Sequence, residues 1–359
     1  MSAQTELAIP EEPLAVSVLT GFLGSGKTTL LRHLLAHPAM EETAVIVNEF
    51  GEIGLDHLLV QQATEDTVLL NSGCLCCTVR GDLVAGMRDL YKRRVKGEVP
   101  AFQRLVIETT GLADPAPILQ TIMTDPLLCE RFRLDGVITT VDAAVGAATL
   151  DRQMESVKQA AVADRILLTK SDLAGAEARA ALEARLRALN PAAPIHPVVQ
   201  GEIAPALLFN AGLYDPTTKT ADVQAWLKAE AYDDHKHDHG HAHSHHHHDV
   251  NRHDASIRAF CLTYDKPLDW DRFNSWIEML ITLYGGSILR IKGVLNVAGA
   301  EEPIVIHGVQ HVFHPPARLE AWPDGDRRSK IVFIVRDLQP EMFEHTLKAF
   351  NEDSTAPVT

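Results

Sequence analysis

The chain has 359 residues, of which 46% are hydrophobic and 23% are charged, a composition typical of a globular protein with a sizeable core. Its length favours two domains of unequal size. The 48 acidic residues outnumber the 33 basic residues and leave a formal net charge of −15. This balance argues against nucleic acid as a main partner, because binding to a phosphate backbone needs clustered Lys and Arg.

The sequence pattern predicts neither a secretory signal nor a membrane span. Residues 1–13 carry three glutamates and no basic stretch, so they do not have the features of a secretory signal. No run of about eighteen apolar residues occurs, and we expect no membrane span. Of the five cysteines, Cys74, Cys76 and Cys77 lie too close together for an obvious disulfide framework. Free thiols in this pattern indicate a reducing compartment, so we expect a cytoplasmic protein.

The first part of the chain alternates short apolar runs with helical patterns. This alternation predicts a mostly parallel sheet flanked by crossover helices. Most of the runs are rich in Val, Ile and Leu, as expected for strands that are covered on both faces. The expected strands are residues 14–19, 44–48, 67–70, 104–108, 136–141, 165–169 and 194–197. The expected helices are residues 27–36, 82–96, 115–124, 154–161 and 174–189.

The composition changes at Asp233. Ten of the 18 histidines fall between His235 and His253, with little apolar content among them, so we expect a disordered linker over residues 233–254. The elements beyond it predict a smaller α+β domain over residues 255–350, with one sheet and helices on one side. Its expected strands are residues 256–264, 287–297, 302–307, 310–314 and 330–335, and its expected helices are residues 270–283 and 340–350.

A P-loop motif follows the first strand. Residues 21–28 read G-F-L-G-S-G-K-T and match G-x-x-x-x-G-K-[ST] at every fixed position. The glycines let backbone N–H groups point inward at phosphate, Lys27 can reach the β- and γ-phosphates, and the Thr28 hydroxyl can coordinate Mg²⁺. The alternative, a glycine-rich turn without a ligand, is disfavoured because strand, loop and helix occur in the required order. The expected nucleotide contacts in this segment are Gly21, Gly24, Ser25, Gly26, Lys27, Thr28 and Thr29.

A second motif indicates which base is bound. Residues 169–172 read T-K-S-D at the end of a predicted strand, close to the N-K-x-D guanine reader of G proteins. The carboxylate of Asp172 can accept both hydrogens that guanine presents, whereas adenine would leave it unpaired. Lys170 would lay its aliphatic stem along the base, and Thr169 replaces the usual Asn while keeping a hydroxyl. Alone, the motif can be a surface turn. Downstream of a P-loop it favours GTP.

An acid and a glycine end another strand. Glu108 closes the apolar run of residues 104–108 and Gly111 follows it, an arrangement in which P-loop proteins place an acid near Mg²⁺ and a glycine N–H near the γ-phosphate. The alternative is a strand-end acid exposed to solvent. We expect Lys27, Thr28 and Glu108 to be the catalytic groups, with Thr28 and Glu108 also holding the metal. The sequence offers no clear arginine finger and no water-orienting glutamine, which predicts slow intrinsic hydrolysis unless a partner or a second copy supplies a group.

The cysteine cluster is a candidate metal site. Cys74, Cys76 and Cys77 are expected in one loop before the helix at residues 82–96. Three thiolates suit Zn²⁺ or another soft divalent ion, but they leave one tetrahedral position open for water, Glu49, Glu52 or an acceptor protein. An incomplete set is what a site that releases its metal would have. The alternatives are a redox dithiol and buried small hydrophobic residues, and the latter is our expectation for Cys129 and Cys261.

The histidine run of residues 235–253 is a second candidate. Neutral imidazoles on a flexible chain can capture Zn²⁺, Ni²⁺, Co²⁺ or Cu²⁺ with little selectivity. The alternative is a solvated spacer. A cysteine cluster in the same chain favours metal buffering or loading. His307, His311 and His314, in the predicted C-terminal strands, are expected to pack or face solvent rather than bind metal.

Taken together, these motifs resemble the CobW/YjiA-type P-loop GTPases, a family of GTP-dependent metallochaperones. The segments that carry the resemblance are residues 21–28, 48–52, 73–77, 108–115 and 169–172. It covers about residues 12–350 and implies an α/β P-loop GTPase domain over residues 12–232, with a mostly parallel sheet flanked by helices, and a smaller α+β CobW-type domain at the C-terminus. The family is functionally mixed, with zinc homeostasis, cobalt delivery for cobalamin synthesis and nitrile hydratase activation all represented. The resemblance also implies that residues 48–52 form a switch between the γ-phosphate and the cysteines.

Three hypotheses follow. The first is a GTP-hydrolysing chaperone that binds zinc, or related cobalt or nickel, at the C-x-C-C segment and delivers it to an unidentified client metalloprotein. A homodimer is one form in which it could act. In it, GTP orders residues 48–56 and 74–77. The second is a metal storage or sensor protein in which the nucleotide only stabilises the fold. The third, a P-loop kinase for a small metabolite, needs an acceptor pocket that the sequence does not reveal.

Overall fold

The computed structural model describes residues 10, 12–47, 60–64, 67–70, 75–78, 83–209, 257–313, 315–323 and 325–351, with the backbone alone for the three short segments between 60 and 78. The chain forms two compact units. One contains most residues before 215, and the other contains the later residues together with 150–162 and 184–193. The histidine run and the proposed switch at residues 48–52 lie outside the described residues.

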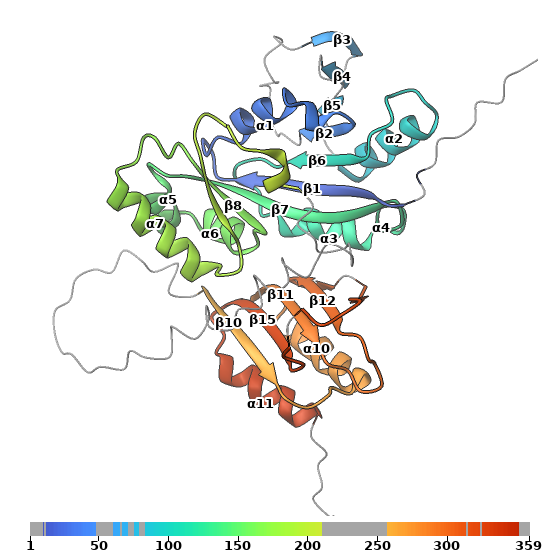
Figure 1. The fold of residues 1–359 in the computed structure, drawn as a ribbon, viewed down its shortest axis with the longest axis vertical. Coiled ribbons are helices and arrows are strands. Elements are labelled where there is room, and N and C mark those ends of the chain that lie inside the picture. Colours follow the sequence, from blue (N-terminus) through green and yellow to red (C-terminus); the bar gives the residue numbers. More distant parts are fainter. Residues whose placement is uncertain are drawn as a thin grey trace, which may run out of the picture. The chain divides into compact units, whose positions relative to one another are not determined.

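The first unit contains a mostly parallel sheet with helices on both faces (Figure 1). Its described strands run in the order β3-β4-β5-β2-β6-β1-β7-β8-β9. Neighbours from β5 to β9 are parallel, and β3 and β4 add an antiparallel edge. The strands are β1 (Leu14–Gly21), β2 (Thr43–Val47), β3 (Val60–Thr64), β4 (Thr67–Leu70), β5 (Leu75–Thr78), β6 (Arg104–Glu108), β7 (Phe132–Asp142), β8 (Arg165–Thr169) and β9 (Ile195–Val198).

The connecting helices follow the crossover pattern predicted for a parallel sheet. They are α1 (Lys27–Leu35), α2 (Leu83–Val95), α3 (Ala116–Thr124), α4 (Pro126–Arg131), α5 (Gly146–Arg152), α6 (Met154–Ala161) and α7 (Ala176–Leu189). The leucines of α1 show why the sheet is stable on that face: Leu30, Leu31 and Leu34 are buried against apolar side chains of β2, β6, β7 and β8. Truncating one such leucine to alanine typically costs about 2–5 kcal/mol.

The C-terminal part of the chain forms an antiparallel sheet in the order β10-β15-β11-β12-β13, with β14 paired to β12. The helices α10 and α11 bury Trp276 and Phe343 against Phe333 of the sheet, with the Phe333 and Phe343 ring centroids 4.7 Å apart. This agrees with the predicted α+β domain with helices on one side. The elements are β10 (Ile257–Tyr264), α10 (Trp270–Tyr284), β11 (Ile288–Leu295), β12 (Ile304–Val309), β13 (Val312–Phe313), β14 (Ala317–Arg318), β15 (Ser329–Arg336) and α11 (Pro340–Asn351).

Several elements differ from the sequence prediction. Strand β7 begins at Phe132 rather than at residue 136, because the polar Asp135 interrupts its apolar run yet is buried and accepts a 3.0 Å hydrogen bond from Ser17. The short helix α4 was not predicted, although Asp125 caps it through the N–H groups of Leu127 and Leu128. The short elements β3, β5, α5 and β14 were also not predicted.

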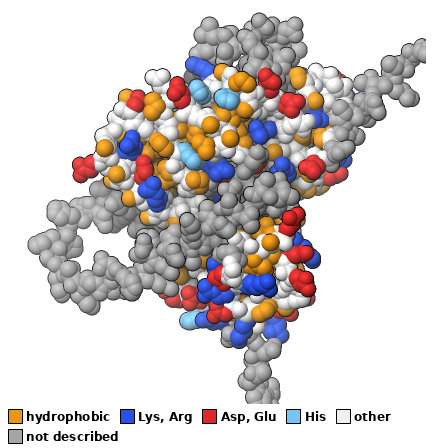
Figure 2. Space-filling view, viewed as in Figure 1, with side chains coloured by type: hydrophobic (Ala, Val, Ile, Leu, Met, Phe, Trp, Pro, Cys, Tyr) orange, Lys and Arg blue, Asp and Glu red, His pale blue; other side chains and the backbone are white. Residues whose placement is uncertain are grey.

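Figure 2 shows acidic and basic side chains interspersed over the visible face, around exposed hydrophobic side chains. Among the described residues, no helix combines the length and the apolar character needed to cross a membrane.

Candidate functional site

The P-loop joins β1 to α1 in a conformation that only glycine adopts readily. Gly21, Gly24 and Gly26 have φ angles of 143°, 73° and 94°, in the region that disfavours any side chain. A Cβ on Gly21 would lie 2.2 Å from Oγ1 of Thr140. Helix α1 starts directly after Gly26, whose lack of a side chain leaves the N-terminus without a side-chain cap, so the positive end of the helix lies at the loop, where it favours an anion.

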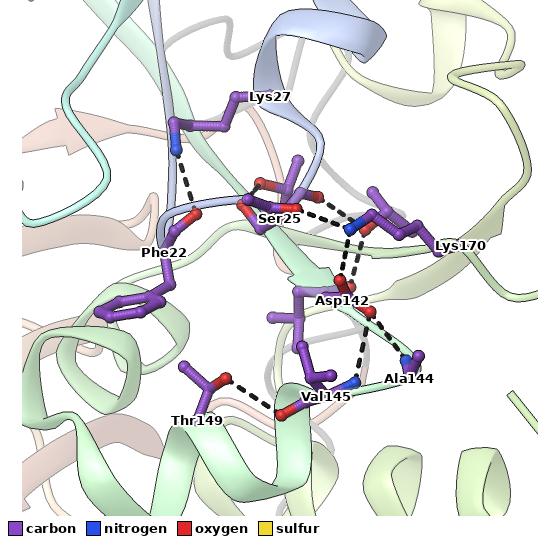
Figure 3. A network of polar contacts seen from close by, with 12 residues as sticks. Phe22, Ser25, Lys27, Asp142, Ala144, Val145, Thr149 and Lys170 are labelled. Carbon is purple, nitrogen blue, oxygen red and sulfur yellow. Dashed lines mark hydrogen bonds and ion pairs between the residues drawn. The ribbon is translucent and has the colours of Figure 1, made fainter. Parts of the chain in front are cut away.

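Lys27 lies folded against the loop that it follows. Its ammonium donates to the carbonyl oxygens of Gly21 at 2.7 Å and Phe22 at 3.2 Å, and the residue is only 8% exposed (Figure 3). The charge of Lys27 therefore already lies against the loop that would hold a phosphate.

Thr28 and Glu108 are brought together by neighbouring strands. Strand β6 pairs with β1 so that Glu108 lies opposite Leu19, and the Thr28 hydroxyl donates to Oε1 of Glu108 at 3.2 Å. Glu108 is 5% exposed, so the alternative of a solvent-facing acid is wrong. A hydroxyl and a buried carboxylate side by side are hard oxygen donors of the kind that Mg²⁺ prefers.

The T-K-S-D segment is tied to the P-loop. The hydroxyl of Thr169 donates to the carbonyl oxygen of Ser25 at 2.6 Å, and Nζ of Lys170 donates to the carbonyl oxygen of Gly24 at 2.8 Å. Asp172 is exposed beside them. The structure thus brings the predicted base-reading residues to the predicted phosphate loop, 144 positions away in sequence.

Gly111 lies directly against the P-loop. A Cβ at this position would lie 2.6 Å from the backbone nitrogen of Leu23 and 2.8 Å from its Cα. No side chain fits there without moving the loop, so the segment that follows Glu108 and the phosphate loop are in backbone contact. Thr109 reinforces this arrangement by donating from its hydroxyl to the hydroxyl of Thr20 at 2.8 Å.

The cysteine segment differs from the prediction. Cys76 and Cys77 lie in strand β5 rather than in a loop, because residues 75–78 pair with β2 on one side and β4 on the other. Cys74 lies outside the described residues. In register, Cys77 is opposite Ile46, which is opposite Ile107, the neighbour of Glu108. Two strand spacings put the backbone of this segment about 10 Å from β6.

The other histidines and cysteines that the sequence analysis singled out have different outcomes. Within the described ranges, no group of three or more His, Cys, Asp or Glu side chains could hold a metal ion. His307 is buried, with Nε2 3.3 Å from Arg290, and His311 packs against Gly285, whereas His314 is outside the described residues. Cys129 is exposed, so its predicted burial is wrong, and Cys261 is half-buried.

Two polar groups in this site were missed by the sequence analysis. Thr140 on β7 shares a 2.6 Å hydrogen bond with the hydroxyl of Ser25. Asp142, the last residue of β7, forms a 2.6 Å ion pair with Lys170. For Asp142, the sequence carried the same signal as for Glu108, namely an acid at the end of an apolar strand that a helix follows.

The fold and this site define a P-loop nucleotide-binding protein of the α/β class. The family model of the CobW/HypB/UreG nucleotide-binding domain matches residues 15–197, and that of the cobalamin synthesis protein cobW C-terminal domain matches residues 257–351. The chain belongs to the CobW/HypB/UreG family.

Its relatives agree with this placement. The zinc chaperone YjiA of Escherichia coli (strain K12) is 34% identical over 331 residues, which cover 92% of this chain and 96% of YjiA. The crystal structure of Zn(II)-bound YjiA GTPase from E. coli superposes with a TM-score of 0.72 at 33% identity and covers 95% of this chain and 100% of that chain. The zinc-regulated GTPase metalloprotein activator 1 of Dictyostelium discoideum is 28% identical and covers 90% of this chain and 76% of its own length. The predicted class, a P-loop GTPase with a CobW-type C-terminal domain, is confirmed.

Proposed function

We propose that this chain hydrolyses GTP and couples the nucleotide cycle to the binding and release of zinc for a client metalloprotein. The observation that carries the proposal is the pairing of Thr28 with Glu108 beside the P-loop. This contact places the carboxylate of Glu108, a group that can bind a metal, next to the phosphate loop and the ammonium of Lys27. The relatives named as zinc chaperones or zinc-regulated GTPases support zinc as the cargo.

In this proposal, the phosphates lie in the loop formed by Gly21, Gly24, Ser25 and Gly26, over the N-terminus of α1 with Thr29 in its first turn. The ammonium of Lys27 leaves its carbonyl partners and binds the β- and γ-phosphates, which offer a full negative charge in their place. The N–H of Gly111 binds the γ-phosphate, as its contact with the loop allows.

Thr28 and Glu108 would hold Mg²⁺, and their oxygens fit it because they lie within one ligand-to-ligand distance of each other. When bound, Mg²⁺ would neutralise charge that develops on the β- and γ-phosphates. Glu108 binds directly or through a water molecule. The sequence shows no clear arginine finger, and we therefore expect slow hydrolysis without a partner or a second copy.

Asp172 would read guanine by accepting hydrogen bonds from the ring N1–H and the exocyclic N2 amino group, with Lys170 along the base and Thr169 fixing the segment to the P-loop. Adenine offers no hydrogen at these two positions, so it would leave the Asp172 carboxylate without those two hydrogen bonds, which lowers affinity. This assignment predicts GTP over ATP.

Cys74, Cys76 and Cys77 would bind the transported metal as thiolates, with cobalt and nickel as possible alternatives to zinc. The register of β5 supports coupling, since β2 runs between the cysteine strand and Glu108 and leads into residues 48–52. The histidine run would load the site. Thiolate chemistry of this kind needs a reducing compartment such as the cytoplasm.

The metal assignment is tested by replacing Cys76 and Cys77 with serine in the full chain. We expect tight stoichiometric zinc binding to be lost in competition with a chromophoric chelator, while GTP affinity stays within about twofold. The matched control is Cys129→Ser, which removes an exposed thiol elsewhere in the domain and should change neither affinity. Unchanged zinc affinity in the double variant would overturn the cysteine site.

The chaperone and the storage or sensor hypotheses differ in turnover. A chaperone that couples the two sites hydrolyses GTP at a rate that responds to zinc, and its zinc affinity differs between the GDP and GTP forms. A storage protein with a structural nucleotide shows neither effect. The decisive measurement is zinc affinity of the apo, GDP and GTP forms with Zn²⁺, Co²⁺ and Ni²⁺ in competition.

A further inference from the structure

Asp142 closes β7 beside the nucleotide site and is only 7% exposed. One oxygen, Oδ1, accepts hydrogen bonds from the N–H groups of Ala144 at 2.8 Å and Val145 at 3.3 Å. The other oxygen, Oδ2, accepts from Nζ of Lys170 at 2.6 Å (Figure 3). The turn therefore fixes the orientation of the carboxylate, which leaves one oxygen directed at the lysine.

Lys170 is held at both ends. Its backbone has a φ of 53°, a left-handed conformation that is unfavourable for a residue with a side chain. Strand β8 keeps it next to Asp142, because Thr169 pairs with Asp142 and accepts a hydrogen bond from the N–H of Ala143 at 2.8 Å. At its tip, the ammonium bridges Asp142 and the carbonyl oxygen of Gly24.

We propose that Asp142 is a positioning residue for nucleotide recognition, which keeps the methylene stem of Lys170 extended as a surface for the base. This inference rests on the proposed role of the T-K-S-D segment. A free lysine side chain has many rotamers and loses that freedom on binding, whereas a stem already held at both ends loses little. The ion pair also neutralises the ammonium, so the side chain presents the base with an apolar stem.

This role predicts how Asp142 affects the discrimination between GTP and ITP. Asp142 acts through Lys170, and the stem contacts the face of the base rather than its hydrogen-bonding edge. Loss of Asp142 should therefore weaken GTP and ITP by the same factor, because the two differ only in the exocyclic amino group that Asp172 would read. Loss of Asp142 should also raise the KM for GTP and leave kcat nearly unchanged.

The test is Asp142→Asn in the full chain. Asparagine keeps an oxygen for the turn and loses the charge that pairs with Lys170. We expect the Kd of GTP to rise about tenfold, as for loss of a charge-assisted hydrogen bond, release of GDP to become faster, and kcat at saturating GTP to stay within about twofold.

Asp125 provides the matched control. Its Oδ1 also accepts two backbone N–H groups, those of Leu127 and Leu128, and its Oδ2 pairs with Arg88 at 2.5 Å. It lies before the amino end of β7, whereas Asp142 lies at the carboxyl end. Asp125→Asn should lower the unfolding midpoint and leave the Kd of GTP unchanged. A merely structural role for Asp142 would give both variants the same profile.

Lys170→Met separates a direct effect from an indirect one, because methionine keeps an apolar stem without the ammonium. In that background, Asp142→Asn should not weaken GTP further. Two outcomes would overturn this inference while leaving the proposed base reading intact. One is that the losses of GTP affinity in Lys170→Met and Asp142→Asn add in the double variant. The other is that Asp142→Asn leaves the Kd of GTP unchanged although the parent chain prefers GTP to ATP. A parent chain that binds ATP as tightly as GTP would overturn the proposed base reading and this inference with it.

Discussion

The hydroxyl of Thr28 donates a hydrogen bond to Oε1 of Glu108 across 3.2 Å, although 80 positions separate the two residues in the sequence. The contact exists because β1 and β6 are parallel neighbours whose carboxyl ends meet at one edge of the sheet. It links the phosphate loop to the buried acid where Mg²⁺ would bind.

Replacing Glu108 with glutamine should lower Mg²⁺-dependent GTP hydrolysis at least about tenfold, because the neutral amide is a weaker ligand for a divalent ion. Nucleotide affinity in the absence of Mg²⁺ should change little. Hydrolysis measured across a Mg²⁺ titration checks this. Glu177→Gln, on the exposed surface of α7, is the control, and equal hydrolysis in the two variants would contradict the assignment.

Thr169→Val should weaken the attachment of the T-K-S-D segment to the P-loop. Valine has the shape of threonine but cannot donate to the carbonyl oxygen of Ser25, now 2.6 Å from the hydroxyl, so a buried acceptor loses its partner. We expect a loss of about 1–2 kcal/mol in the free energy of unfolding and weaker GTP binding. Thr169→Ser keeps the hydroxyl and should behave like the parent chain in denaturant unfolding. If both variants lose the same stability, the hydrogen bond is not the cause.

Gly111→Ala should impair the site by steric conflict. The new Cβ would lie 2.6 Å from the backbone nitrogen of Leu23. Since Leu23 is part of the P-loop, relieving this contact requires the loop backbone to move. Overpacking of this kind costs about 1–3 kcal/mol, and we expect GTP hydrolysis to fall more than stability. Gly286→Ala is the control, since a Cβ there meets nothing within 4 Å. Full hydrolysis in Gly111→Ala would show that the loop tolerates the displacement.

An ion pair directly before strand β15 makes the stability of the protein depend on pH. Hydrogen bonds from Arg328 and, more weakly, Lys330 lower the pKa of Asp326 well below its ordinary value near 3.8. A folded-state pKa below the unfolded one stabilises the protein above the unfolded value, and this stabilisation is lost as the pH falls through the folded value. Asp326→Asn should therefore lower the unfolding midpoint by a few degrees at pH 7, and the difference from the parent should shrink below about pH 4. Glu320→Gln, an exposed carboxylate in the same part of the chain, should show no such trend in thermal unfolding followed against pH.

The sequence by itself determined the P-loop, the T-K-S-D segment at a strand end and the alternation of strands and helices, because each depends on residues close together in the chain. Gly21 to Thr28 needs a strand before it and a helix after it, and both are visible as local patterns of apolar residues. For the same reason the extents of β6 and β8 were predicted to the residue.

Only the tertiary structure decided which of these segments meet. Strand order is set by packing between distant parts of the chain, so the sequence could not show that β7 lies between β1 and β8. That order puts Asp142 beside Lys170. It also buries Asp135 within β7, a strand that the local pattern of apolar residues predicts to begin only at residue 136. Pairing on both sides likewise makes residues 75–78 a strand, because such a short strand depends on backbone hydrogen bonds to β2 and β4, which no pattern within its own four residues reveals.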